Sequence, residues 1–229
     1  DFEDQELSAW ETYPGAIMNI DSTYASYGKF CAKHSNFSSG GSKYASSFLK
    51  FQGQEGNFSI EFDFMSPEEG GAYNWKIINI TDIPPDEFNS YPISAYCVSL
   101  AFGERWGDPS TNTYGVYYAS QGTGYDTGFK FQEFEWINFK LDINVPENVY
   151  TLYINGQLTS KDIPFYRPAN QISYIHFSTE SSVCYFDNVD IYQNWNIGWH
   201  RLPNMPAGRR DVAVAAYKKN LYIFGGKDD

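Results

Sequence analysis

Residues 136–156 read WINFKLDINVPENVYTLYING, and this stretch decides the fold. Apolar and polar side chains alternate in 136–143 and again in 150–154, which is the pattern of a strand with one buried face. The Asn155-Gly156 pair that follows favours a tight hairpin, because both turn residues accept a positive φ. The stretch therefore predicts consecutive antiparallel strands that lead into a hairpin.

The same alternation recurs along most of the chain. It predicts further strands at 58–64, 96–102, 115–119, 172–178 and 184–192. No window shows the 3.6-residue period of an amphipathic helix. Short strands separated by Gly, Pro and Asn turns predict an all-β fold, an antiparallel two-sheet β-sandwich of the jelly-roll kind, over residues 1–193.

Composition and charge exclude several classes of protein. Aromatic residues make up 19% of the 229 residues, far more than in a disordered segment. The formal net charge is −12, and a chain this acidic repels nucleic-acid phosphates and anionic lipid surfaces. The apolar runs are only a few residues long, so we expect no membrane insertion.

The three cysteines, Cys31, Cys97 and Cys184, lie far apart and have no CxxC spacing, so a zinc site is not expected. Two readings stay open. One disulfide with one cysteine left over is possible, and so are three buried thiols.

Composition changes after Tyr192. Residues 194–198 read as a linker, and 199–229 contain two short apolar strands, VAVAAY and LYIFGG, joined by a polar turn. The order Trp, Leu-Pro, Met-Pro, Arg-Arg, apolar strand and Gly-Gly resembles the opening of a kelch repeat. A kelch blade needs about 50 residues, so this segment is an incomplete blade at most. Either the chain is the front of a longer protein or its hairpin serves another purpose.

Three motifs in the first 193 residues carry a second resemblance. Phe2-Glu3-Asp4 at the start, the 136–156 stretch, and YFDNVDIY at 185–192 together resemble the concanavalin A-like jelly roll of laminin-G domains, legume lectins and glucanases. Members of this superfamily bind glycans, serve as adhesion modules or cleave polysaccharides. The resemblance thus implies the fold but does not choose among these functions.

Catalytic motifs of this superfamily are incomplete here. Hydrolytic relatives carry Glu-x-Asp-x-x-Glu, and the chain has Glu61 and Asp63 but Ser66 in the third place. Lyase relatives need a Tyr/His pair with an Arg or Gln that neutralises a uronate. The chain has three histidines, His34, His176 and His200. We expect His176 to be a packed sheet residue, and we expect no catalysis.

The resemblance also implies a structural calcium. In many such jelly rolls a carboxylate of the first strand and an Asp of the last strand share this ion, and Glu3 and Asp187 match those positions. Backbone carbonyls near 22–27 would complete a calcium shell of six to eight oxygens. The alternative is that both are solvated strand-end carboxylates.

A saccharide site is expected on two loops. Residues 102–109 and 120–126 offer Trp106 and Tyr125 beside three charged residues, Arg105, Asp108 and Asp126. Sugar rings stack on exposed aromatic side chains, and their hydroxyls pair with carboxylates and amides. The alternative is that Trp106 only covers a sheet edge.

These observations predict a non-catalytic recognition module, extracellular or at the cell surface, that binds a glycan or a partner protein. One alternative is a polysaccharide lyase or glycoside hydrolase that uses the sandwich face. A second is a structural subunit of a surface filament. An isolated hairpin has unpaired edges that recruit further strands, so copies could associate through residues 199–229.

Overall fold

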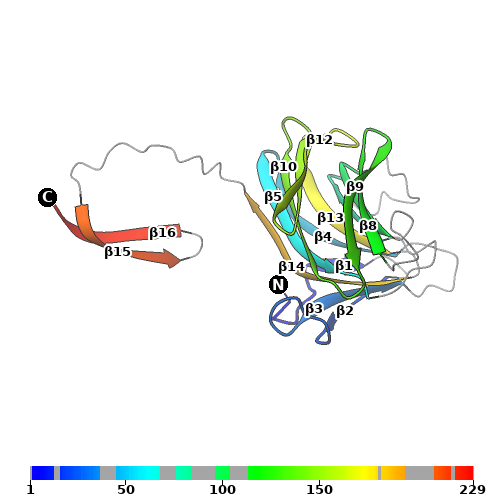
Figure 1. The fold of residues 1–229 in the computed structure, drawn as a ribbon, viewed down its shortest axis with the longest axis horizontal. Helices are drawn as coiled ribbons and strands as arrows, with labels where there is room; N and C mark the ends of the chain where they lie inside the picture. The colour runs from blue at the N-terminus through cyan, green and yellow to red at the C-terminus, as the bar shows by residue number, and fades with distance from the viewer. Residues whose placement is uncertain are drawn as a thin grey trace. The chain divides into compact units, whose positions relative to one another are not determined.

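The computed structural model describes residues 2–12, 16–36, 45–67, 76–83, 96–103, 113–179, 182–193, 209–217 and 220–228. The chain divides into two compact units, Asp1–Trp195 and Asn196–Asp229, and each is described by itself (Figure 1).

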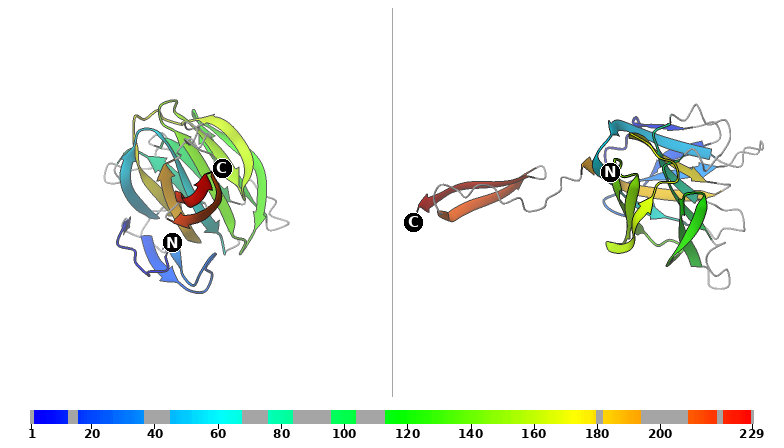
Figure 2. Two further views of the ribbon diagram at one scale, coloured as in Figure 1. Left: turned by 90° about the vertical axis from the view of Figure 1, so that its left-hand side faces the viewer. Right: turned by 90° about the horizontal axis from the view of Figure 1, so that it is seen from above.

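The first unit is a sandwich of two seven-stranded antiparallel sheets that lie face to face (Figures 1 and 2). Sheet A has, in spatial order, β1 (Trp10–Thr12), β4 (Ala45–Gln54), β13 (Ile172–Thr179), β6 (Lys76–Thr81), β7 (Val98–Gly103), β8 (Thr113–Ser120) and β9 (Thr123–Gln132). Sheet B has β12 (Gln157–Pro164), β11 (Val149–Ile154), β10 (Ile137–Asn144), β5 (Asn57–Met65), β14 (Val183–Gln193), β3 (Cys31–Asn36) and β2 (Ala16–Asp21). The predicted all-β sandwich is confirmed.

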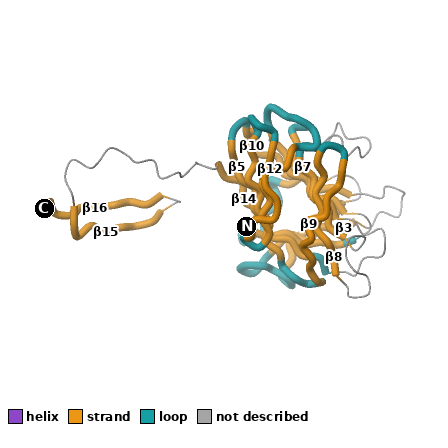
Figure 3. Tube along the Cα trace, turned by 45° about the horizontal axis from the view of Figure 1, so that its top comes forward, coloured by secondary structure: helices purple, strands orange, loops and turns teal. Residues whose placement is uncertain are grey.

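Strands and loops account for the whole described part of the chain (Figure 3). Within it we find no helix that is long and apolar enough to cross a membrane.

The stretch 136–156 folds as its pattern predicts. Strand β10 pairs with β11, with Phe139 opposite Ile154 and Ile143 opposite Tyr150. Asn155 and Gly156 form the turn to β12 with φ of 50° and 73°. The Asn155 side chain also accepts a hydrogen bond of 2.9 Å from the Asn138 amide, which ties the turn to β10.

The core between the sheets is largely aromatic. Phe64 of β5 stacks on Phe102 of β7 with ring centroids 4.4 Å apart, and Phe177 of β13 meets Phe186 of β14 at 3.8 Å. Because strand side chains alternate between faces, burial of Phe62 and Phe64 turns Glu61 and Asp63 to the outer face of sheet B. The core therefore decides where these two carboxylates lie.

All three cysteines are buried free thiols, so the disulfide alternative is wrong. Burial raises the pKa of Cys31 to about 12 and that of Cys97 to about 11, which keeps both protonated and unreactive.

The second unit contains the predicted C-terminal hairpin. Strand β15 (Arg209–Tyr217) pairs antiparallel with β16 (Asn220–Asp228), with Tyr217 opposite Asn220. The kelch resemblance of this segment stays a prediction.

His34 links the two sheets inside the sandwich. Its Nδ1 lies 3.3 Å from the Thr179 hydroxyl of sheet A, and Met18 and Cys184 flank it in register within sheet B. Burial lowers the pKa of His34 to about 4. The imidazole is thus neutral in the folded protein, whereas the unfolded chain takes up a proton near pH 6.5.

We expect the free energy of unfolding to fall as the pH drops from 6.5 to 4, since only the unfolded state binds this proton in that window. A shift of this size corresponds to a loss of roughly 3 kcal/mol by pH 4. Urea unfolding at pH 7, 5.5 and 4 measures the effect, and His34→Gln should lower the slope by about half, because the buried His176, whose pKa burial also lowers to about 4, contributes the other half. An equal slope in the variant would show that His34 does not set the acid sensitivity.

Candidate functional site

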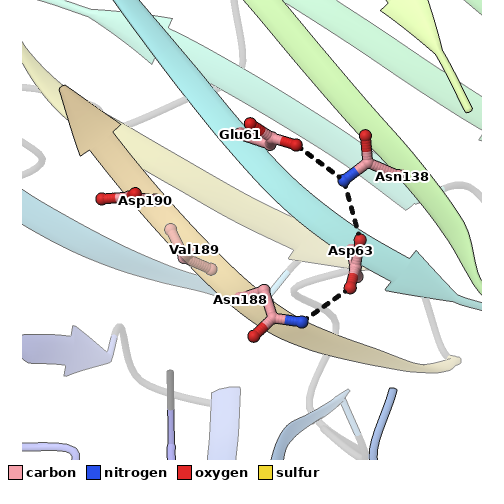
Figure 4. Close-up of a pocket in the computed structure, with 6 residues that line it drawn as sticks. All are labelled: Glu61, Asp63, Asn138, Asn188, Val189 and Asp190. Carbon is pink, nitrogen blue, oxygen red and sulfur yellow. Dashed lines mark hydrogen bonds between the residues drawn. The ribbon is translucent and has the colours of Figure 1, made fainter. Parts of the chain in front are cut away.

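A polar pocket of about 510 Å³ opens on the outer face of sheet B. Glu61, Asp63, Asn138, Asn188, Val189 and Asp190 line it (Figure 4). These residues come from three neighbouring strands, β5, β10 and β14. The pocket is therefore built on the rigid sheet rather than on loops.

Register and one irregularity place the lining side chains. Asn138 lies directly opposite Asp63 in the β10–β5 pair, and Asp190 lies opposite Glu61 in the β14–β5 pair. Between Asp187 and Asp190 the β14 strand carries one extra residue, a β-bulge, and Asn188 there has a φ of 50°. The bulge brings the Asn188 side chain to the pocket.

Two carboxamides join the carboxylates. The Asn138 side-chain nitrogen donates to Glu61 Oε1 at 3.2 Å and to Asp63 Oδ1 at 2.9 Å. The Asn188 side-chain nitrogen donates to Asp63 Oδ2 at 2.8 Å (Figure 4). Acceptors and donors thus alternate across the three strands, with Asp63 between the two amides.

Tyrosines and a lysine surround this ladder. The Tyr192 hydroxyl donates to Glu61 Oε2 at 3.0 Å, and burial together with this hydrogen bond raises the pKa of Tyr192. Lys140 forms an ion pair with Asp142 at 3.1 Å and lies 5.2 Å from the ring centre of Tyr153. The cation nearest in sequence to Asn138 is therefore engaged with another carboxylate.

A loop of residues 22–30 closes one side of the carboxylate cluster. Asp187 faces Asp63 directly across the β14–β5 pair, and its Oδ2 accepts the backbone amides of Ser26 at 3.0 Å and Tyr27 at 3.2 Å. The Ser26 hydroxyl donates to Asp63 Oδ2 at 2.7 Å. Burial, with a smaller effect of the Asp63 charge, raises the pKa of Asp187 against these hydrogen bonds.

Glu3 holds the other end of the same loop. Its Oε1 accepts the backbone amides of Lys29 at 2.8 Å and Phe30 at 2.9 Å, and these bonds lower the pKa of Glu3. A Cβ atom on Gly28 would lie only 2.3 Å from this oxygen. The loop therefore needs glycine at position 28 to let the carboxylate approach.

The structure thus brings the two predicted metal residues, Glu3 and Asp187, to one short loop. The hydrogen bonds that these two carboxylates accept from the loop come from backbone N–H groups, not from the expected carbonyl side of the chain. In the described residues no group of three or more His, Cys, Asp or Glu side chains is arranged to hold a metal. Both carboxylates contact the same loop, and carboxylate oxygens are ligands of the kind calcium prefers.

The predicted saccharide residues lie elsewhere. Trp106, Arg105 and Asp108 fall outside the described residues. Tyr125 and Asp126 lie on the edge strand β9 of sheet A, and they do not line the pocket.

On β9, the ring of Tyr125 is 44% exposed and stacks on Tyr118 with centroids 5.3 Å apart. Burial opposes ionisation of Asp126, but hydrogen bonds from Gly128, Tyr117 and Lys130 lower its pKa overall. Asp126 is thus engaged within the protein, whereas Tyr125 offers an accessible ring.

Comparison with known proteins shows which folds this one resembles. No protein-family model and no curated protein sequence matches the chain. In structure, the chain is similar to a sialidase with a TM-score of 0.62 at 14% identity, over 85% of this chain and 18% of that one. The shared feature is the jelly-roll sandwich.

Two smaller structures match over almost their whole length. The cellulose induced protein Cip1 has a TM-score of 0.58 at 14% identity, over 83% of this chain and 94% of Cip1. An endo-β-1,4-glucuronan lyase from the fungus Trichoderma reesei has a TM-score of 0.54 at 10% identity, over 82% of this chain and 92% of the lyase.

Gly28→Ala should destabilise the sandwich more than Gly128→Ala. Both glycines have nearly the same φ, 75° and 76°, but a Cβ at Gly128 meets nothing within 4 Å. The left-handed backbone alone costs about 1–3 kcal/mol for a side chain. Any further loss in Gly28→Ala reports displacement of Glu3, measured as the difference between the two variants in chemical unfolding. Equal losses would contradict the proposed packing of Glu3 on this loop.

Proposed function

We propose that the sandwich is a non-catalytic recognition module that binds a glycan in the pocket on sheet B. The observation that carries the proposal is the ladder of Glu61, Asn138, Asp63 and Asn188 in an open pocket of about 510 Å³. That volume is typical of sites for small ligands. Sugar hydroxyls both donate and accept hydrogen bonds, so they match a row in which carboxylates and carboxamides alternate.

The charge of the pocket limits which ligands can bind there. Glu61, Asp63 and Asp190 are acidic, and among the described residues that line the pocket there is no cation. Carboxylate or sulfate groups on a glycan would be repelled at close range. The proposed ligand is therefore a neutral saccharide, bound through its hydroxyls.

Cleavage of the glycan is the second candidate function. The Asn138 side-chain nitrogen donates to Glu61 Oε1 at 3.2 Å and to Asp63 Oδ1 at 2.9 Å, so the distance between these two oxygens is at most the sum of the two. Retaining glycosidases place two carboxyl groups about 5–5.5 Å apart. However, a catalytic acid must be kept protonated by apolar surroundings, and here amide and hydroxyl donors contact both groups. Binding without cleavage is therefore the function we favour.

The similar structures support a role with polysaccharides only through what their names state. One is induced by cellulose, and the other is a lyase of glucuronan. A module with this role would act outside the cell or at its surface, where it meets glycans or proteins that carry them.

Asn138→Ala tests the pocket. Asn138 positions the Glu61 and Asp63 carboxylates that would bind the sugar hydroxyls. Without it we expect binding of neutral oligosaccharides to weaken about tenfold or more, because one lost hydrogen bond from the ligand to a charged carboxylate costs about 1.5–3 kcal/mol. A glycan array followed by titration calorimetry of the best ligand measures the change. Asn19→Ala, at an exposed position of β2 in the same sheet, is the matched control.

Unchanged binding by Asn138→Ala would refute the assignment of the pocket. Release of reducing ends or unsaturated sugars from a bound polysaccharide, abolished by Glu61→Gln, would show that the module is an enzyme.

We also propose that Glu3 and Asp187 hold a structural calcium at the loop 22–30. Glu3→Gln keeps an oxygen for the amides of Lys29 and Phe30 but removes the charge that a calcium ion needs. We expect 1 mM calcium, about the extracellular range of affinity, to raise the midpoint of thermal unfolding of the native protein but not of this variant. Equal midpoints of the native protein with calcium and with chelator would exclude the ion.

A further inference from the structure

Phe134, in the turn between β9 and β10, has a backbone conformation that bulky residues avoid. Its φ is 58°, in the left-handed region. Among the described residues, the other non-glycine positions with positive φ are all Asn, Asp or Gln. Short polar side chains such as Asn enter this region readily, whereas an aromatic residue there is an outlier. Asn would form the same turn with less strain, so the turn alone does not explain the phenylalanine.

The ring of Phe134 is also poorly covered by the protein. It is 52% exposed, and its centroid lies 5.7 Å from that of Tyr24. Tyr24 in turn packs edge-on against the buried Tyr185, with centroids 5.2 Å apart. Single exposed apolar residues are common on protein surfaces, but here the exposed ring is held by a strained backbone. Strain of this kind gathers at sites of function.

These rings lie next to the pocket on sheet B. Tyr185 precedes Asp187 by two residues on β14, and Asp187 lies opposite Asp63 of the pocket. Two residues of a strand span roughly 7 Å and point to the same face of a sheet. The loop that carries Tyr24 makes a second connection, since its Ser26 hydroxyl donates to Asp63 Oδ2 at 2.7 Å. The aromatic surface is therefore a neighbour of the pocket.

The pocket and the rings offer complementary contacts to a sugar chain. Carboxylates, carboxamides and one valine line the pocket, and the described lining includes no aromatic ring. A pyranose ring carries hydroxyls at its rim and C–H groups on its faces, and apolar faces pack on aromatic rings. In a β-1,4-linked glucose chain every ring hydroxyl is equatorial, which leaves both faces of each ring apolar. Such a chain can place one ring in the pocket and the next on the aromatic surface.

We infer that Phe134 and Tyr24 form a stacking platform for the sugar ring that follows the one in the pocket. The ligand is then a chain of neutral, β-1,4-linked sugars with flat C–H faces rather than a single sugar. This inference rests on the function proposed for the pocket and adds the apolar contact that the pocket lacks. It also accounts for the strain at Phe134, because the turn holds the ring open for a ligand to cover.

Titration calorimetry with a β-1,4-linked glucose tetramer and with methyl β-glucoside tests the platform. We expect the native protein to bind the tetramer more tightly than the monomer. Phe134→Asn should weaken binding of the tetramer about tenfold, because a stacking contact is lost, and leave the monomer unchanged. The thermal midpoint of this variant should stay equal or rise, since Asn accepts the left-handed backbone.

Matched variants separate the platform from other roles. Phe134→Tyr keeps the ring and should bind the tetramer like the native protein. Tyr125→Asn makes a comparable change at a 44% exposed ring on the edge of sheet A, and it should leave both affinities unchanged. Asn138→Ala, in the pocket, should weaken binding of both sugars.

The possible failures are distinguishable. Equal affinity of the native protein for the two sugars, or native affinity of Phe134→Asn for the tetramer, would overturn the platform and leave the pocket in place. A lower thermal midpoint with native affinity would show that Phe134 serves the turn alone. Absence of binding to either sugar, or native affinity for both in Asn138→Ala, would overturn the function proposed for the pocket and the platform with it.

Discussion

Asp63 and Asp187 face each other across neighbouring strands, and the arrangement of the outer face of sheet B follows from how the protein accommodates two adjacent carboxylates. Like charges directly opposite each other destabilise a sheet. Here the amides of Ser26 and Tyr27, the Ser26 hydroxyl and the Asn188 side chain all donate into the pair. These hydrogen bonds offset the repulsion between the two carboxylates and order the loop 22–30.

The same donors connect distant parts of the chain. The loop that they hold lies between β2 and β3, and Glu3 fixes its far end through Lys29 and Phe30. The N-terminal segment, the loop and the last strand of the sandwich are thus joined by carboxylate contacts rather than by apolar packing alone. The pocket lies beside this junction because Asp63 belongs to both, with Ser26 on one side and Asn138 on the other.

Sequence patterning predicted the strands that bury one clear apolar face. β5, β10 and β13 pack against the core, and their alternation is strong because one set of side chains is fully buried. The edge strands β9 and β12 were not predicted, because most of their side chains are exposed and their sequences show no clear alternation. The alternation of apolar and polar residues reflects burial of one strand face, so it is weakest where both faces are exposed to solvent.

The pocket was harder to foresee than the fold. Asn138 is visible in the sequence as an outward residue of an alternating strand, and Glu61 and Asp63 stand out as part of a hydrolase-like motif. What the pattern cannot show is that β10 pairs with β5 in the register that sets Asn138 against Asp63. The bulge that turns Asn188 to the same place breaks the alternation itself, so a strict two-residue period would assign its neighbours to the wrong faces.

The outward-pointing residues of the two sheets differ in chemistry, because the residues between the sheets form the core and hold the sheets together. Aromatic contacts such as Phe64 with Phe102 and Phe177 with Phe186 join the sheets from inside. The outward positions of β5, β10 and β14 can then carry carboxylates and amides, whereas the outward row on β13 and β6 carries His176 and Asn79 without a fixed charge. A ligand that meets the sheet B face must therefore tolerate negative charge. The difference arises from alternate residues of strands whose other residues build one shared core.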